Sequence, residues 1–190
     1  MSGTNTNPVF SDFELEKIGL KFKTGSAYQV VECIGSLEEE MESKTVTKKC
    51  RGVVKKKKTK GTGNGNLKIS LHIPWAIYTQ AFGMNLDTLI DGVKAYGCNS
   101  VHEEFGIVGD VKDEDGVAKL LAYPNAVIES GTAKKIENGA EEVAEVELEV
   151  SVMPDEYGNG KYEALVDDID AEVAASWMTA FTPALVQKAS

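Results

Sequence analysis

Apolar and polar residues alternate along several stretches of this chain, and the alternation predicts a protein built mainly of β-strands. Residues 145–152 are the clearest stretch, with apolar side chains at every second position and three glutamates between them. Residues 17–23 and 67–73 have the same two-residue period. Because successive side chains of a strand point to opposite faces of a sheet, each stretch is expected to bury one face and expose the other.

Turn-forming residues separate the strand-like stretches, at residues 25–26, 113–116 and 154–160. A further strand-like run follows each turn, so neighbouring strands are expected to pair as hairpins. Pro124 interrupts one of these runs. Because proline has no backbone N–H to donate, a bulge or an edge position is expected there.

Three stretches have a helical period instead. The first helix is expected at residues 74–82, where proline suits the first turn. Its sheet-facing stripe is Trp75, Tyr78, Ala81 and Phe82. A second short helix is expected at residues 85–93, capped by Asn85. A last helix is expected to begin at Asp170, with an apolar stripe of Ala174, Trp177, Met178 and Phe181.

Together these elements favour a mostly β fold, a β-sandwich or barrel with a flanking α-helix, a long β-hairpin and a C-terminal helix. A length of 190 residues fits one domain covering residues 1–190. Within it we expect an N-terminal arm at residues 1–12, a long charged hairpin at 38–66, and a C-terminal helix and arm at 170–190. The tip of the hairpin is expected at residues 61–66 (GTGNGN), because glycine and asparagine favour turns.

Charge is strongly segregated along the chain. The formal net charge is −10, from 20 basic and 30 acidic residues. Residues 44–60 hold nine of the basic residues and no acidic one, so the rest of the chain has 11 basic against 30 acidic residues, a net charge of −19. One short basic segment therefore accompanies a strongly acidic body.

The basic segment contains a run of lysines, namely Lys55, Lys56, Lys57, Lys58 and Lys60. Three interpretations remain open. The run can be a solvated, self-repelling loop, or it can contact nucleic-acid phosphates, although the interleaved aromatic residues typical of such surfaces are missing. It can also dock on an acidic protein surface, such as the body of a second copy. A contact of that kind is head-to-tail and propagates into rings or filaments.

The glutamates Glu145, Glu147 and Glu149 share one face of their expected strand. Such a row is usually a solvated sheet face. If subunits formed a ring with this face inward, the row would give an acidic lumen that repels the DNA backbone. These three residues are therefore candidates for facing a lumen.

Sequence motifs for catalysis or cofactor binding are weak. The chain has no GxxxxGK[ST], and residues 61–66 follow lysines and precede a strand, which is the wrong context for a dinucleotide site. The acidic group Asp110, Asp113, Glu114 and Asp115 lacks the spacing of an EF-hand loop and is expected to be an ordinary turn. His102 with Glu103 and Glu104 lacks a third metal ligand and is expected to lie in a solvated loop.

The three cysteines, Cys33, Cys50 and Cys98, are far apart and form no CxxC. Neither a disulfide framework nor a zinc site is expected, and Cys98 is expected to be a buried or inert thiol. We expect no enzymatic activity, no cofactor and no bound metal. The N-terminus has no signal-peptide pattern and no apolar run could span a bilayer, so we expect a protein that folds in the cytoplasm and has no membrane partner.

Three stretches resemble the major tail (tail tube) proteins of long, non-contractile-tailed phages of Gram-positive bacteria: FELEKIGLKFKTGSAYQV, FGIVGDVKDEDGVAKLLAYPNAVIES and MPDEYGNGKYEALVDDIDAEVAASWMTAFTPALV. The step HIPWAIYTQAFGM adds to the resemblance. The resemblance rests on the order of these stretches along the chain and on their pattern of residue types, and not on a catalytic signature.

This resemblance implies a β-sandwich subunit that forms stacked hexameric rings, in which residues 38–66 would be the long loop bridging rings and 74–82 the flanking helix. It implies a virion tail assembled in the host cytoplasm, with the tape-measure, tail terminator and tip proteins as partners. Genomic DNA would pass through the tube without specific binding. The alternative is a monomeric β-sandwich module that binds a host surface or a carbohydrate.

Overall fold

A computed structural model describes residues 9–139 and 141–188 of the chain. The fold is mostly β, as predicted, with 44% strand and 13% helix. The strands are β1 (Glu14–Phe22), β2 (Gln29–Val31), β3 (Ile34–Cys50), β4 (Val53–Leu71), β5 (Phe105–Lys112), β6 (Ala118–Ile128), β7 (Val146–Met153) and β8 (Tyr162–Leu165). The helices are α1 (Trp75–Ala81) and α2 (Ala171–Ala180), with 3-10 turns η1 (Val166–Asp168) and η2 (Pro183–Val186).

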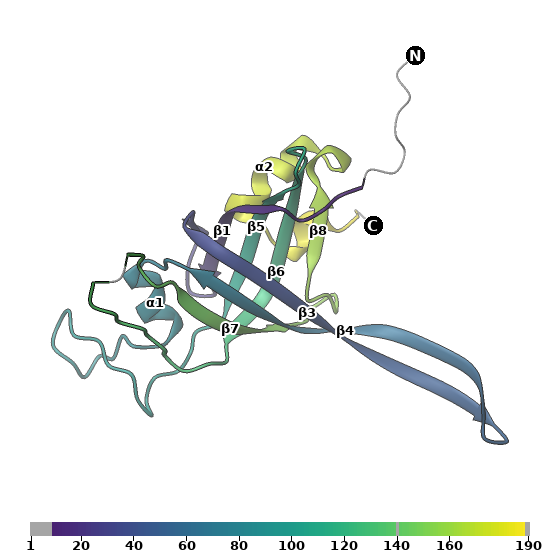
Figure 1. Ribbon diagram of the computed structural model, residues 1–190, viewed down its shortest axis with the longest axis horizontal. Helices are drawn as coiled ribbons and strands as arrows, with labels where there is room; N and C mark the ends of the chain where they lie inside the picture. Colours follow the sequence, from purple (N-terminus) through teal and green to yellow (C-terminus); the bar gives the residue numbers. More distant parts are fainter. Residues whose placement is uncertain (1–8, 140, 189–190) are drawn as a thin grey trace, which may run out of the picture.

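All strands belong to one antiparallel sheet in the order β2-β1-β5-β6-β7-β4-β3, and β8 pairs with β6 outside this path (Figure 1). The first half of β6 pairs with β8 and its second half with β7, while β5 pairs along its other edge. A predicted irregularity at Pro124 separates the halves: Ile107 and Phe105 are two residues apart, whereas their partners Tyr123 and Ala126 are three apart. The extra residue is a β-bulge, which bends β6 and increases its twist.

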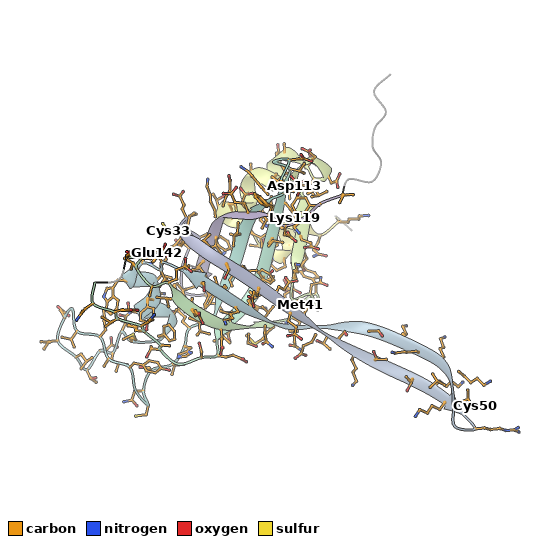
Figure 2. All side chains as sticks on the ribbon, in the orientation of Figure 1. Cys33, Met41, Cys50, Asp113, Lys119 and Glu142 are labelled. Atoms are coloured by element: carbon orange, nitrogen blue, oxygen red, sulfur yellow. The ribbon has the colours of Figure 1, made fainter. Side chains whose placement is uncertain are left out.

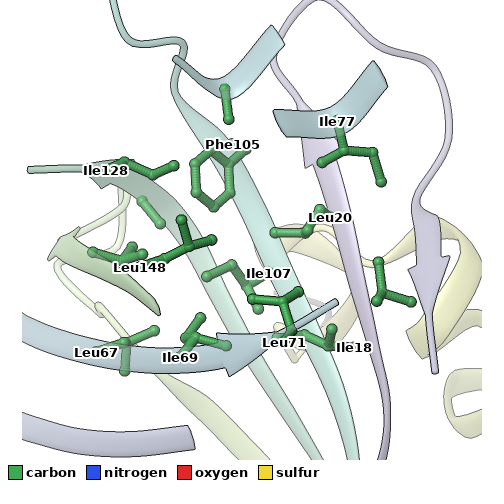
Figure 3. Close-up of a cluster of buried hydrophobic side chains, with 14 of the residues drawn as sticks. Ile18, Leu20, Leu67, Ile69, Leu71, Ile77, Phe105, Ile107, Ile128 and Leu148 are labelled. Carbon is green, nitrogen blue, oxygen red and sulfur yellow. The ribbon is translucent and has the colours of Figure 1, made fainter. Parts of the chain in front are cut away.

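The main core lies on the inner side of this bent sheet, where inward side chains of β1, β4, β5, β6 and β7 meet (Figure 3). The alternation in the sequence decides which side chains point inward. In β7, Leu148 and Val150 are buried, whereas Glu147 and Glu149 are exposed, as predicted. Each fully buried aliphatic side chain contributes about 1.5–3 kcal/mol relative to an exposed one.

A second, smaller core lies on the outer face of β5 and β6, where α2 packs. It contains Val108, Leu120, Ala122, Trp177 and Phe181. The indole Nε1–H of Trp177 donates to the carbonyl oxygen of Leu121 at 2.9 Å. The predicted C-terminal helix and its apolar stripe are therefore confirmed, since the stripe is what attaches α2 to the sheet.

α1 closes one end of the main core with the buried residues Ile77, Tyr78 and Ala81. Trp75, which the helical period placed toward the sheet, is 55% exposed. The ammonium of Lys134 lies 4.9 Å from the centroid of its ring. The prediction for Trp75 was wrong: Ile77 joins the main core instead, and the ring of Trp75 stacks on Tyr78 with 5.9 Å between the ring centroids.

The described residues 85–93 form turns instead of the predicted second helix. Gly92 has a φ of 86°, in the left-handed region, and Ile90 is 79% exposed. Val93 is also exposed, so these apolar side chains contribute little burial to offset the cost of nucleating a short helix.

Residues 1–8 of the predicted N-terminal arm lie outside the described residues, and the rest of the arm contacts the body through Phe10 and Asp12. Phe10 packs against the main core, and the ammonium of Lys119 lies 4.6 Å from the centroid of its ring. The same ammonium pairs with Asp12 at 2.5 Å.

Candidate assembly surfaces

The hairpin of β3 and β4 extends well beyond the core (Figure 1). Its strands remain paired out to Cys50 and Val53. β7 pairs with β4 only from Gly65 to Leu71, so in the described chain residues 43–61 form a ribbon of two strands, and every one of these residues is exposed. We call residues 43–61 the distal hairpin.

The turn of the hairpin is at Arg51 and Gly52, and the prediction of a tip at residues 61–66 was wrong. Arg51 and Gly52 have φ values of 50° and 81°. Positive φ at both central residues is the backbone of a two-residue hairpin turn whose twist matches the flanking strands.

Residues 61–66 lie within β4 and form a large bulge there. The partners of Met41 and Ser43 on β3 are Gly65 and Gly61, so the single residue between them on β3 faces three residues, 62–64, on β4. Glycine permits both a turn and a bulge. The structure has a bulge and not a turn here because β4 pairs with β3 on both sides of residues 61–66. The local sequence alone does not distinguish the two.

One face of the distal hairpin is almost entirely basic. It carries Lys44, Val46, Lys48, Lys56, Lys58 and Lys60, and we call it the lysine face. Lys44 lies directly opposite Lys60 and Lys48 opposite Lys56. Like charges directly opposite each other destabilise a strand pair. An anionic partner would reduce this repulsion and so stabilise the hairpin when it binds to the lysine face.

The structure divides the five predicted lysines between two faces. Lys56, Lys58 and Lys60 lie on the lysine face, whereas Lys57 lies opposite Thr47 on the other side of the hairpin. Lys55 lies at the register shift near the tip. Lys44 and Lys48 of the lysine face were missed, although their spacing of four residues would have placed them together once a strand was assumed.

A polar network fixes the root of the hairpin to the body. The carboxylate of Glu39 on β3 accepts a hydrogen bond from the hydroxyl of Tyr123 and pairs with Lys161 at 2.8 Å. Lys161 also pairs with Glu163 at 2.9 Å. Burial, together with the hydrogen bond to Glu39, raises the pKa of Tyr123. These contacts connect β3, at the root of the distal hairpin, to β6 and to the residues around the start of β8.

The outward face of β3, β4 and β7 beside this root is acidic. Its carboxylates are Glu38, Glu40, Glu147 and Glu149, and we call it the acidic face. Lys68 stands between Glu38 and Glu149 in cross-strand register. Its ammonium lies 3.7 Å from Glu147. One ammonium among four carboxylates leaves the face negative.

The three lumen candidates are only partly together. Glu147 and Glu149 lie on the acidic face, opposite Ser70 and Lys68. Glu145 precedes β7, and its carboxylate occupies the space that a Cβ on Gly35 would fill, with Oε2 2.0 Å from that position. Glu145 therefore lies at the margin of the face, against the start of β3.

The acidic group at the β5–β6 turn has a structural role. Asp113 is 6% exposed, and its Oδ1 accepts hydrogen bonds from the backbone N–H groups of Asp115 and Val117 at 3.0 and 2.7 Å. This Asx-type arrangement closes the turn. Glu114 and Asp115 are left exposed.

His102 is half-buried, so the expectation of a solvated loop was wrong for this residue. Its Nδ1 lies 2.6 Å from the carbonyl oxygen of Ile128, an arrangement in which Nδ1–H donates. Its Nε2 lies 3.0 Å from the hydroxyl of Tyr96 and accepts from it. The carboxylates of Glu103 and Glu104 turn to side chains of α1 and the β1–β2 turn. These contacts fasten the long α1–β5 connection to the sheet.

Cys33, Cys50 and Cys98 are all exposed and carry free thiols. Of the two alternatives for Cys98, the buried thiol was therefore wrong, and the inert thiol stays a prediction. Cys50 stands at the end of the distal hairpin (Figure 2). Within residues 9–139 and 141–188, no cluster of three acidic, histidine or cysteine side chains is arranged to hold a metal ion. The same residues include no helix with the length and apolar character needed to cross a bilayer.

No protein-family model matches the sequence, and no curated protein does. Among solved structures, the chain is similar to one in the anti-feeding prophage cap, described as its tube terminating cap. The TM-score is 0.46 at 10% identity, over 86% of this chain and 99% of that one. A chain in the anti-feeding prophage baseplate gives a TM-score of 0.46 at 11% identity, over 85% and 98%. Likeness of this strength assigns no function to the chain.

Proposed function

We propose that this chain is a structural subunit, and not an enzyme, that polymerises into the tail tube of a long-tailed phage. The distal hairpin carries the proposal. It projects from a fixed root, bears a concentrated positive face, and belongs to a chain whose remaining residues have a net charge of −19. A protruding element with a charge opposite to that of the body favours head-to-tail contacts between copies, which generate rings or filaments.

The open edge of the sheet supports the same function. β3 is the last strand in the sheet order and has 17 residues. Long open edges pair with other chains unless they are guarded, and lysine is one of the guarding residues. In the distal part of β3, lysines disfavour pairing with another chain. The part of β3 beside the body lacks lysines, so it can pair with a neighbouring subunit.

In this proposal Lys56, Lys58 and Lys60 of the lysine face contact the next ring of the stack, while the other two candidates, Lys55 and Lys57, add positive charge beside that contact. The acidic face, with Glu147 and Glu149 and with Glu145 at its margin, lines the lumen. A negative wall repels the DNA backbone, so the genome slides through without specific binding. Hexameric rings, a place in the virion tail after assembly in the host cytoplasm, and tape-measure, terminator and tip proteins as partners complete the proposal.

Negative-stain electron microscopy of the purified chain, across a concentration and salt series, tests the proposal. We expect rings or hollow tubes that loosen at high salt, because exposed charge pairs are screened. A monomer at every concentration, even after a tail-tip complex is added as an initiator, would overturn it. A monomer whose melting temperature rises with a carbohydrate would instead support a binding module.

Replacing both Glu147 and Glu149 by lysine tests the lumen separately. Tubes of this variant are expected to form and to retain DNA at low salt, because the wall then attracts phosphates. Variant tubes that release DNA as freely as the wild type would remove the acidic face from the lumen and leave the tube itself intact.

A further inference from the structure

A second acidic surface lies at the far end of the sheet from the hairpin root. The strand register brings three chain segments to one edge. Glu14 on β1 pairs with Lys112 on β5, Lys112 pairs with Ala118 on β6, and Lys119 pairs with Leu165 at the end of β8. The start of β1, the β5–β6 turn and η1, which follows β8, are therefore neighbours.

This edge is rich in exposed carboxylates. They are Glu14, Glu114, Asp115, Asp167 and Asp168, and we call them the acidic end. In the described part of the chain, none of the five takes part in an ion pair, since Lys112 and Lys119 pair with other carboxylates. Phe13, beside Glu14, is 73% exposed. The acidic end is thus an unneutralised negative surface with an apolar side chain at its border.

We propose that the acidic end receives the lysine face of the distal hairpin of a second copy. This inference rests on the proposed function, because it assigns the acceptor of a contact that polymerisation needs. The lysine face offers five ammonium groups around Val46, which is 63% exposed, and the acidic end offers five carboxylates beside Phe13. Charge and apolar surface are complementary, which gives both steering and specificity to the contact.

The arrangement makes the contact intermolecular and directional. The bulge of β4 at the hairpin root lies against Gly160, which precedes β8, whereas the acidic end follows the last residue of β8. Donor and acceptor therefore lie at opposite ends of β8, and the hairpin points away from the acidic end of its own chain (Figure 1). Such a contact leaves a free donor and a free acceptor on every copy, so it propagates. The acidic face remains open to a lumen.

Reversal of four acceptor charges tests the inference. The variant Glu114→Lys, Asp115→Lys, Asp167→Lys, Asp168→Lys keeps Asp113, which shapes the turn. We expect it to stay folded and to lose assembly under salt conditions in which the wild type forms tubes. The matched control Asp87→Lys, Asp91→Lys, Glu141→Lys, Glu142→Lys makes the same change in net charge on exposed loops elsewhere, and is expected to assemble.

A charge swap makes the test independent of general effects of net charge. Adding Lys56→Glu, Lys58→Glu and Lys60→Glu to the four-residue acceptor variant is expected to restore assembly of that chain with itself. The swapped chain is not expected to join wild-type tubes, because both of its surfaces then repel those of the wild type. Failure of the swap to restore assembly, with each chain folded, would count against a direct contact.

Cross-linking locates the contact in assembled material. Cys50 is a natural probe at the hairpin tip, and Cys33→Ser and Cys98→Ser remove the other thiols. With Asp168→Cys added, a short bis-maleimide is expected to give a ladder of linked subunits, whereas Asp91→Cys is not. This inference alone would be overturned if the wild type forms tubes, the four-lysine acceptor variant forms them equally well, and the Asp168→Cys variant gives no ladder. A wild-type chain that never self-associates would overturn the proposed function as well.

Discussion

Gly160 lies directly against the backbone of Gly63: a Cβ on Gly160 would be 1.9 Å from the carbonyl oxygen of Gly63. Gly63 has a φ of 83°, and a Cβ there would lie 2.8 Å from the Cβ of Pro154. Gly63 belongs to the bulge at which the hairpin leaves the sheet, and Gly160 to the β7–β8 connection. The two segments approach this closely because neither glycine has a side chain, and the contact supports the hairpin root.

Gly160→Ala is expected to separate these segments and change the direction of the hairpin. The core is untouched, so the far-UV circular dichroism spectrum should remain that of the wild type, while assembly seen by electron microscopy falls sharply. Gly97→Ala is the control, because a Cβ at Gly97 meets nothing within 4 Å. Normal tubes of Gly160→Ala would show that the contact does not set the hairpin direction.

Lys58→Glu and Lys57→Glu change the net charge equally but on opposite faces of the hairpin. Lys58 lies opposite Val46 on the lysine face, and Lys57 lies opposite Thr47. We expect Lys58→Glu to weaken assembly at least tenfold more than Lys57→Glu, which is about 1.4 kcal/mol in free energy. Sedimentation across a concentration series measures this difference. Equal effects of the two variants would mean that total charge, and not the lysine face, drives assembly.

Lys48→Glu is expected to separate hairpin stability from assembly. It places a carboxylate directly opposite Lys56, and replacing a like-charge pair by an opposite-charge pair stabilises a strand pair by roughly 0.2–1 kcal/mol. Amide exchange of the distal hairpin in the monomer should therefore slow, while assembly weakens because the lysine face has lost charge. A variant that assembles better than the wild type would contradict the role given to this face.

Trp177→Ala is expected to lower the free energy of unfolding by about 3–5 kcal/mol, the usual cost of removing a buried tryptophan. Trp177 is 2% exposed, and its loss also leaves the carbonyl oxygen of Leu121 without its donor. Urea unfolding gives the measurement. Thr179→Ala, at an exposed position of the same helix, should stay within about 0.5 kcal/mol of the wild type.

Tyr28 makes stability depend on alkaline pH. Burial raises its pKa from 10.0 to about 12, because the neutral phenol is favoured where water is excluded. The folded-state pKa is raised, so its stabilising contribution is fully present below pH 10 and is lost as the pH rises through about 12. Tyr28→Phe should flatten the fall of unfolding free energy between these values. An unchanged pH profile would show that Tyr28 titrates normally.

The sequence by itself determined the strands and most of their faces. A two-residue period requires that Leu148 and Glu149 point to opposite sides whatever their partners are. The bulge at Pro124 was equally local, since a missing N–H interrupts a ladder in any sheet. The attachment of α2 followed from an apolar stripe that had to be buried. The order of the charged residues along the sequence also showed that the basic segment is separate from the acidic remainder of the chain.

Only the tertiary structure decided the position of the hairpin turn, the division of the lysines between two faces, and the neighbours at the acidic end. Residues 61–66 have the composition of a turn, but pairing with β3 continues past them and moves the turn to Arg51 and Gly52. The acidic end joins three segments far apart in sequence. Both outcomes depend on which strands pair and in which register, and register is set by contacts summed over the whole sheet and not by local preference.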